Sequence, residues 1–327
     1  MPSLVRSKLG LLAMLVVGLA LVAPAGALAA YGGFQPQHAH SPNVEHINVA
    51  YWVIFGFTTV IFIVVMATLV TFIVKYRSRG RARTVEGVQV HGNTQLELIW
   101  TVAPVIILAL IGTMIFFLLP KITPPAKAAG TLEITVEGHQ FYWQFNYPNG
   151  ARTINTLYVP VDRDVRFKVI SGDVVHSFWV PQLQGKIQAI PGRINHTGFR
   201  ADKVGTYQGY CGLICGPFHA KMLLTVKVTD DASYASTLAA NSTRKVLGRT
   251  EFQGVCATCH GMQGQGGYGP ALANNSILAQ KSALEAIVRN GRGLMPPVGN
   301  TWTDEQINAL AQYTKTHVYK GASTSGG

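Results

Sequence analysis

Residues 211–222 read CGLICGPFHAKM, and this segment decides how the part of the chain around it is interpreted. Within twelve residues it offers two thiols, an imidazole and a thioether, those of Cys211, Cys215, His219 and Met222. Soft sulfur ligands together with imidazole select copper, and a His/Cys set with a weak axial Met is typical of an electron-transfer site. Because a site with one copper ion needs only one Cys, the second Cys predicts two thiolates that bridge two copper ions.

A pair of copper ions needs a second imidazole, and His176 is the candidate. It lies in the segment DVVHSFWVP (173–181), at the end of an expected strand. Taken alone, such a histidine is more often part of a protein core. A disulfide between the two thiols is an alternative, but it leaves His219 and Met222 unexplained. Zinc also binds Cys and His, although the methionine and the β context disfavour it.

Short alternating strands surround this segment from Thr131 to Val228. LEITV at 132–136 and LLTVKV at 223–228 are examples, and turn sequences separate them. Strands at this spacing predict an all-β sandwich or barrel over residues 131–229. Residues 230–244, rich in Ala, Ser, Thr and Asp, are expected to link it to a second domain.

The second motif, CATCH at 256–260, is a C-x-x-C-H sequence of the kind that attaches a c-type haem. The thiols of Cys256 and Cys259 are expected to bond the haem, with His260 as the proximal iron ligand. Met295, 35 residues after His260, stands on a Gly/Pro-rich loop and is expected to be the second axial ligand. His/Met ligation raises the haem potential and suits electron transfer. A disulfide, a redox pair or a zinc site is the alternative for the motif alone.

Residues 245–320 have helical character with Gly/Pro-rich loops between the helices. This pattern predicts a small all-α domain. With the CATCH motif, the GPAL segment at 269–272 and the helical segment at 303–313, it resembles the class I cytochromes c. Residues 321–327, rich in Ser and Gly, are expected to be a flexible tail.

Two apolar runs precede these domains. Val49–Val74 and Leu98–Leu119 carry no charged residue over 26 and 22 residues, and about 20 apolar residues cross the hydrocarbon core of a bilayer. They predict a transmembrane hairpin over residues 45–120; buried core helices are the alternative. The basic run from Lys75 to Arg83 between them predicts a cytoplasmic loop, which places both following domains outside the cytoplasm.

Residues 1–29 have a basic start, an apolar stretch and a small-residue end. That order is typical of a secretory signal peptide, and an uncleaved anchor helix is the alternative.

The composition agrees with a membrane protein. Hydrophobic residues make up 48% of the chain and charged residues only 13%. The formal net charge of +12 would suit a nucleic-acid or acidic partner. However, much of that charge falls in the basic run beside an apolar helix, so no nucleic-acid partner is expected.

From about Glu45 to Val228 the chain resembles subunit II of cytochrome c oxidase. The resemblance rests on the copper segment together with four other stretches: NTQLELIWTVAP at 93–104, Gly138-His139-Gln140 with the aromatic run after it, VHSF at 175–178 and Pro191-Gly192-Arg193. It implies a cupredoxin-like Greek-key barrel with a binuclear copper centre, CuA. By this resemblance the copper ligands are the side chains of His176, Cys211, Cys215, His219 and Met222 and the carbonyl of Leu213.

The resemblance also implies two further roles. The aromatic run 141–147, with Tyr142 and Trp143, resembles the segment at which electrons enter; plain hydrophobic packing is the alternative. Glu97 matches an acidic residue at the mouth of a proton-uptake channel, and an interfacial acid without function is the alternative.

Three residues depart from the family pattern. Leu213 stands where a Glu bridges to a magnesium ion, Phe141 where a Trp is usual, and Gln188 where an acid is usual. The last two weaken a docking surface for a separate basic cytochrome c. A donor domain fused to the chain has a high effective concentration and does not need such a surface.

Together these features imply the electron-entry subunit of a haem–copper terminal oxidase in a bacterial inner membrane, with its copper and haem domains on the periplasmic side. The expected partners are the catalytic subunit I, subunit III and an external donor, either a cytochrome c or a quinol–cytochrome c reductase. Two alternatives stay open. Leu213 gives weight to the CuA subunit of a nitric oxide reductase, whereas a copper-delivery or storage protein would release its copper readily to a chelator.

Overall fold

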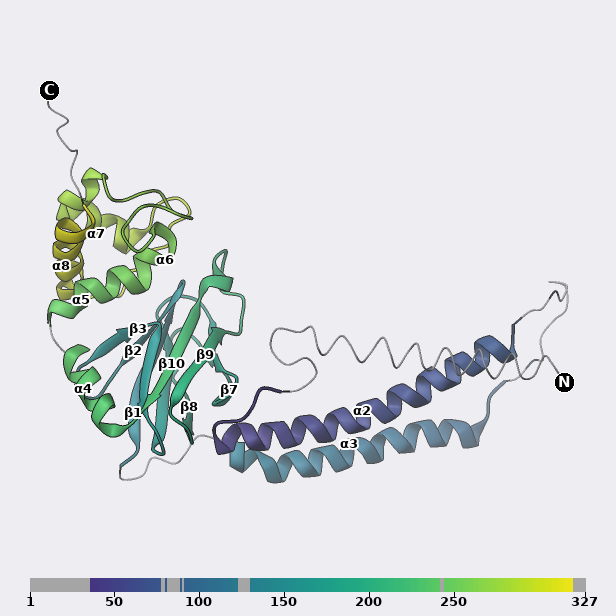
Figure 1. Ribbon diagram of the computed structural model, residues 1–327. Coiled ribbons are helices and arrows are strands. Elements are labelled where there is room, and N and C mark those ends of the chain that lie inside the picture. The colour runs from purple at the N-terminus through teal and green to yellow at the C-terminus, as the bar shows by residue number, and fades with distance from the viewer. Residues whose placement is uncertain are drawn as a thin grey trace, which may run out of the picture. The chain divides into compact units, whose positions relative to one another are not determined.

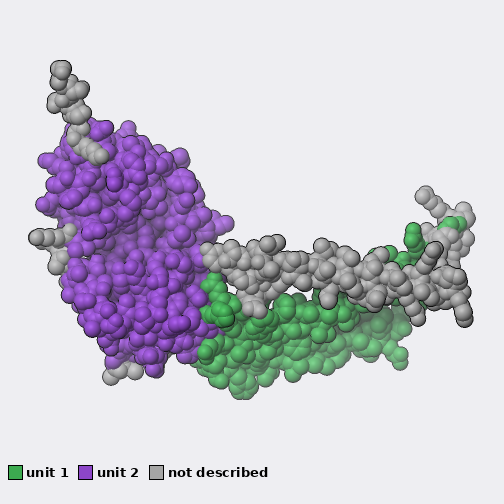
Figure 2. Space-filling view, in the orientation of Figure 1, with its two compact units in different colours: residues 1–38, 45–122 green, residues 39–44, 123–327 purple. Residues whose placement is uncertain are grey.

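The structure is a computed structural model that describes residues 36–77, 80, 89, 91–122, 130–241 and 244–319. The expected signal peptide at 1–29 and tail at 321–327 lie outside the described residues, as does most of the basic loop. The described residues form two compact units, one within residues 36–38 and 45–122 and the other within residues 39–44 and 130–319 (Figure 2).

Two long apolar helices, α2 (Pro42–Lys75) and α3 (Thr94–Ile122), contain 18-residue segments with mean hydropathies of 2.7 and 2.8. At 1.5 Å per residue, their 34 and 29 residues extend about 51 and 44 Å, which exceeds the ~30 Å hydrocarbon core. No residue of their most apolar windows is buried, and a helix that is apolar on every side is typical of a membrane span. The two predicted spans are therefore confirmed, and each helix extends beyond the predicted bounds at both ends.

Ten strands form the β domain (residues 130–229). They are β1 (Leu132–His139), β2 (Tyr142–Asn146), β3 (Arg152–Ile154), β4 (Thr156–Pro160), β5 (Asp164–Ser171), β6 (His176–Val180), β7 (Gln184–Ala189), β8 (Asn195–Arg200), β9 (Gly205–Cys211) and β10 (Leu223–Thr229).

These strands make two five-stranded sheets, ordered β3-β2-β1-β5-β8 and β4-β10-β9-β6-β7 (Figure 1). The pairs β1/β5 and β4/β10 are parallel and the other named pairs are antiparallel. Parallel neighbours require crossover connections, so the chain passes between the two sheets in addition to forming the consecutive antiparallel pairs β1/β2, β2/β3, β6/β7 and β9/β10. The predicted all-β, cupredoxin-like class is confirmed.

The alternation of residues along the strands builds the core between the sheets. In β5, Val165, Phe167 and Val169 point inward and are fully buried, whereas the residues between them are not. A strand places successive side chains on opposite faces, so this pattern orients one face to the core. Phe178 on β6 meets Phe167 and Trp143 from the facing sheet in edge-on ring contacts.

The C-terminal helical domain (residues 244–319) contains short helices connected by loops. These are α5 (Arg244–Glu251), the π-helix η2 (Phe252–Cys256), α6 (Ala257–His260), the 3-10 helix η3 (Ser276–Ala279), α7 (Lys281–Asn290), α8 (Asp304–Tyr313) and the π-helix η4 (Thr314–Val318). A capping box at Thr303 and Gln306 fixes the start of α8. The predicted small helical domain is confirmed.

The segment expected to be a linker is a packed element. Residues Asp231–Asn241 form helix α4, and its Tyr234 and Leu238 are buried in the core of the β domain. The segment has a polar composition overall, so the pattern of its two buried residues was not recognised. Tyr234 and Leu238 lie four positions apart and therefore share one helix face.

Candidate metal centres

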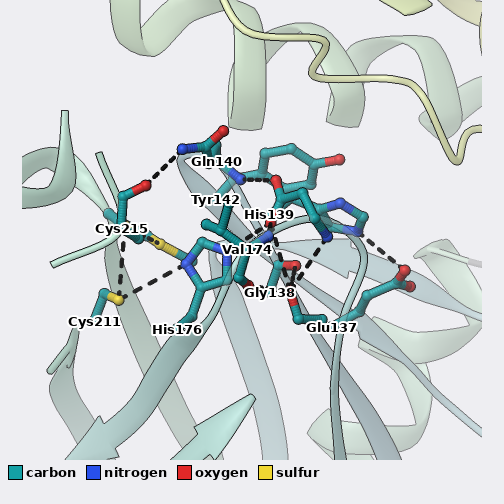
Figure 3. A network of polar contacts seen from close by, with 12 residues as sticks. Glu137, Gly138, His139, Gln140, Tyr142, Val174, His176, Cys211 and Cys215 are labelled. Atoms are coloured by element: carbon teal, nitrogen blue, oxygen red, sulfur yellow. Dashed lines mark hydrogen bonds and ion pairs between the residues drawn. The ribbon is translucent and has the colours of Figure 1, made fainter. Parts of the chain in front are cut away.

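Three of the predicted copper ligands meet where β6 begins and β9 ends. The Sγ atoms of Cys211 and Cys215 lie 4.0 Å apart, and Nδ1 of His176 lies 3.9 Å from Sγ of Cys211 (Figure 3). Antiparallel pairing of Phe178 with Cys211 holds the two strands in this register. All three side chains are buried. Residues separated by 35 positions in sequence therefore form one compact donor cluster.

The remaining predicted donors complete the cluster from the loop that follows. Nδ1 of His219 lies 3.5 Å from Sγ of Cys215, and Sδ of Met222 lies 3.8 Å from the same sulfur. The carbonyl oxygen of Leu213 lies 3.2 Å from Sγ of Cys211. Residues His219–Lys221 form the 3-10 helix η1, which turns the chain so that the buried Met222 faces inward.

This donor set fits copper rather than a disulfide. Disulfide sulfurs are bonded at about 2.05 Å, whereas the two sulfurs here are 4.0 Å apart. Thiolate–metal bonds of about 2.3 Å would let one ion contact both sulfurs at this spacing. Two thiolates, two imidazoles, a thioether and a carbonyl match the preference of copper for soft ligands and imidazole.

A carboxylate orients the buried histidine. Oδ1 of Asp173 lies 2.8 Å from Nε2 of His176, and the backbone N–H of Gln140 donates to Oδ2 of Asp173 at 2.6 Å. Burial alone would raise the pKa of Asp173, but its hydrogen bonds outweigh burial and lower it. The ionised carboxylate accepts a hydrogen bond from the Nε2–H group of His176, so the lone pair of Nδ1 faces the sulfurs. Such outer partners fix the tautomer of a ligating histidine.

The two thiols influence each other strongly. The hydrogen bond from Cys215 lowers the pKa of Cys211, and the same interaction raises the pKa of Cys215. The pair of thiols therefore loses one proton readily, and the negative charge of the first thiolate opposes ionisation of the second thiol. A bound cation removes that opposition because it neutralises both sulfurs.

Most residues of the CATCH motif line a cavity of about 420 Å³ in the C-terminal helical domain. Cys256, Cys259, His260 and Met295 all contribute to its wall. Nδ1 of His260 lies 2.7 Å from the carbonyl oxygen of Pro270. This oxygen accepts a hydrogen bond from the Nδ1–H group, which leaves the lone pair of Nε2 available to a metal. The structure thus brings together all four residues that the sequence predicts for the haem.

Gly269 in the loop leaves room for the imidazole ring of His260. A Cβ atom on Gly269 would lie 2.6 Å from Cε1 of His260, closer than side chains approach. With two free thiols, an oriented imidazole, a thioether and mainly apolar walls, the cavity fits a covalently attached haem.

Side chains of the β domain close one side of this cavity. Gln140, Phe141, Tyr142 and Phe218 all line it. Gln140 also donates its side-chain N–H to the carbonyl oxygen of Cys215, and Phe218 directly precedes His219 in the chain. The copper cluster and the haem cavity therefore share a wall.

Aromatic contacts extend along the same wall. The rings of Phe141 and Phe218 lie 5.4 Å apart, and those of Phe218 and Tyr268 lie 6.1 Å apart. The ammonium of Lys221 lies 4.7 Å from the centre of the Tyr268 ring, a cation–π contact between the two domains.

The two residues predicted for electron entry are both buried. Tyr142 faces the C-terminal helical domain, and Trp143 faces the core, where its ring lies 5.9 Å from that of His176. Successive residues of a strand point to opposite faces, so β2 presents one ring to each centre. Neither ring is exposed to a separate donor protein.

The hydroxyl of Tyr142 connects the domains. It donates to the carbonyl of Val298 at 2.8 Å and accepts from Nε1 of Trp302 at 2.9 Å. We expect Tyr142→Phe to lower the stability of the domain contact by about 1–3 kcal/mol, because two buried polar groups lose their partner. Denaturant unfolding followed through haem absorbance measures this effect. Tyr268→Phe is the control, since that ring is 67% exposed; equal stability of wild type and Tyr142→Phe would contradict the assignment.

Glu97 lies at the start of α3, and its Oε1 accepts the backbone N–H of Asn93 at 3.2 Å. This contact stabilises a helix start, and the role at a channel mouth stays a prediction. Leu213 and Gln188 line a second cavity, also of about 420 Å³, together with Lys186 and Arg193. This cavity wall therefore carries two basic residues, and neutral residues stand at the two positions where the family pattern has acids.

Sequence reasoning missed several contributors. Asp173 stands three residues before His176, and this spacing is a signal from which its role as the partner of His176 could have been predicted. The partners of Tyr142 and the Lys221–Tyr268 contact depend on how the domains pack, and no local pattern indicates them.

Comparisons with known proteins agree with this arrangement. Residues 29–118 match the family model of the cytochrome c oxidase subunit II transmembrane domain, and residues 151–229 match that of its periplasmic domain. Residues 246–313 match the model of cytochrome c oxidase, cbb3-type, subunit III.

Individual relatives show the same similarity. Cytochrome c oxidase subunit 2 of Alkalihalophilus pseudofirmus is 34% identical over 78% of this chain and 82% of its own length. A probable cytochrome c oxidase subunit 2 of Rickettsia bellii is 32% identical over 64% of this chain and 84% of its own length. Among solved structures, the periplasmic domain of subunit II of the cytochrome oxidase of Bradyrhizobium japonicum is 33% identical; the match covers 35% of this chain and 95% of that domain, with a TM-score of 0.34.

Proposed function

This chain belongs to the cytochrome c oxidase subunit II family, and we propose that it takes electrons from an external donor at its haem c and passes them through CuA to the catalytic subunit. The observation that carries the proposal is the shared wall between the two centres. Gln140 lines the haem cavity and hydrogen-bonds the backbone of Cys215, and Phe218 lines the same cavity beside His219.

The geometry supports the proposed site residues. CuA would be held by the side chains of His176, Cys211, Cys215, His219 and Met222 and by the carbonyl of Leu213. Haem c would be attached through Cys256 and Cys259, with His260 and Met295 as the iron ligands. When bound, these two groups supply the one-electron chemistry. The residues that would bind them are already positioned in the protein interior, so the surroundings need to rearrange little during electron transfer.

Tyr142 and Trp143 have a revised role in this proposal. They lie between the haem cavity and His176 as an internal connection rather than as an external entry surface. The external donor then meets the C-terminal helical domain. The identity of that donor, a cytochrome c or a quinol–cytochrome c reductase, belongs to the proposal, as do subunits I and III as partners and the role of Glu97 in proton uptake.

The proposed domain limits are 131–229 for the copper domain and 245–320 for the haem domain, with α4 as a packed connection. The C-terminal helical domain has its own hydrophobic cluster, which includes Phe252, Trp302 and Leu310. Tyr142 and Ile154 of the β domain join that cluster. This overlap supports a fixed contact between the domains, as rapid internal transfer requires.

Leu213 favours one other candidate, the CuA subunit of a nitric oxide reductase. Its apolar side chain replaces the acid that would bridge to magnesium, and Lys186 and Arg193 line the cavity beside it.

The two functions are separated by purifying the intact complex from membranes through a tag on the C-terminus. Reductant-driven consumption of oxygen and of nitric oxide is then measured on the same preparation. We expect fast oxygen consumption and slow loss of nitric oxide. The reverse ratio would assign the chain to the reductase. Ready loss of copper to a chelator, with neither activity, would indicate copper delivery or storage instead.

A further inference from the structure

Glu251 is a fully buried acid that the electron relay does not use. It is the last residue of α5 and has no exposed surface. Its Oε1 accepts a hydrogen bond from the side-chain N–H of Gln306 on α8, at 3.2 Å. Its Oε2 is buried and has no hydrogen-bond partner among the described residues. An ionised carboxylate with one neutral partner is costly in such a place.

The groups that face Glu251 compensate its charge only in part. Arg152 on β3 is the cation that attracts the Glu251 carboxylate. Tyr142 on β2 and Cys256 on η2 are neutral, and the negative charge of Glu251 raises the pKa of both groups. Burial is the largest influence and raises the pKa of Glu251 to about 7, against the weaker lowering effects of Gln306 and Arg152. Both protonation states are therefore accessible near neutral pH.

Glu251 adjoins the wall of the haem cavity through its chain neighbour and through its partner Gln306. Phe252, the next residue, lines that cavity, and so does Leu310, one turn after Gln306 on α8. A charge held in the cavity therefore acts on Glu251 through a thin apolar layer, where electrostatic interactions are weakly screened.

We propose that Glu251 binds a proton when the haem is reduced and releases it when the haem is oxidised. This inference rests on the haem site proposed above. The external donor supplies one electron, which converts ferric to ferrous iron, and solvent supplies one proton, which bonds to the carboxylate. Ferric iron carries one more positive charge than ferrous iron and so favours the ionised carboxylate. By linkage, the carboxylate favours the ferric form to the same degree.

The direct test is the midpoint potential of the haem in the full-length protein, measured by spectroscopic titration from pH 5 to 9. We expect the wild-type potential to fall as pH rises through about 6 to 8, with a total change equivalent to roughly tenfold in the reduction equilibrium. With one proton bound per electron, the reduction equilibrium cannot change by more than tenfold per pH unit. This limit corresponds to a change of about 59 mV in the midpoint potential.

In Glu251→Gln the potential should lie near the wild-type acidic value and stay constant across this range, because the amide is always neutral. Glu285→Gln is the matched control: its carboxylate lies in the same domain but is partly exposed and paired with Arg289 at 2.8 Å. That variant should retain the wild-type pH profile. A flat wild-type profile, or an unchanged slope in Glu251→Gln, would overturn the proposal.

A second variant tests the direction of the effect. Arg152→Gln removes the cation that lowers the pKa of Glu251. The fall in the haem midpoint potential should therefore occur at higher pH, with the same total change as in the wild type. A shift to lower pH would contradict the assignment.

Infrared difference spectroscopy on the wild-type protein does not depend on any variant folding. At pH 7, reduction should produce a carboxylic-acid C=O band that shifts in D₂O; no such band would overturn the proposal. The haem site itself is tested separately by the absorbance of covalently bound haem. A preparation without haem would refute the proposed function, whereas a haem of pH-independent potential refutes only the role of Glu251.

Discussion

Replacing Cys215 with Ser should remove the copper centre and leave the haem in place. Its sulfur lies within 4.0 Å of a second thiol, an imidazole and a thioether, so one substitution removes the donor shared by the whole cluster. Loss of an outer partner already costs about 10–100-fold in metal affinity, and loss of a bridging ligand should cost at least as much. Donor-driven oxygen consumption should fall by roughly 100-fold or more.

The measurement is the copper-to-haem ratio of the purified protein, together with the rate of haem reduction by the donor. The haem should still become reduced at the wild-type rate but should pass no electron onward. Asp173→Asn serves as the graded comparison, because it removes only the outer partner of His176. A full complement of copper in Cys215→Ser would show that this sulfur is not a ligand.

The double variant Cys256→Ala with Cys259→Ala should have the opposite pattern, with copper retained and no covalent haem. The main core of the β domain is built from its own strands and α4, so the copper cluster does not need a filled haem cavity to fold. Oxygen consumption driven by the protein donor should drop by at least about tenfold. A small-molecule reductant should still reduce the copper.

Haem staining on a denaturing gel and the copper content establish what the double variant carries, and the two reductants are then compared. Wild-type rates with the protein donor would contradict the proposed order of the centres, since they would show that the donor reduces the copper directly.

The sequence was sufficient for the elements and ligands that local patterns encode. The two apolar helices follow from uncharged runs, the β domain from alternation, and the CATCH motif with Met295 from spacing alone. The cluster at Cys211 and Cys215 could be predicted because most of its donors lie on one short loop. His176 was a candidate from the need for a second imidazole, and the family resemblance made it a ligand. Sequence distance hides the strand register that brings it to Cys211.

The contacts between the domains could not be predicted in the same way. The family resemblance assigns Tyr142 to electron entry, and an aromatic run has the same pattern whether it is exposed or covered. Its burial depends on Trp302 and Val298, which lie about 160 residues away. Glu251 occupies an ordinary position for an exposed helical acid, and only the packing of α5 against α8 buries it.

The central claim is that electrons pass from haem to copper within one chain, through the wall that contains Gln140 and Phe218. Its most direct test is to reduce the haem of the full-length protein with a short light pulse and to follow haem reoxidation and copper reduction together. We predict a single first-order phase in both signals, with a rate that does not change with protein concentration. A rate that rises in proportion to protein concentration, or a haem that stays reduced beside oxidised copper, would contradict the account.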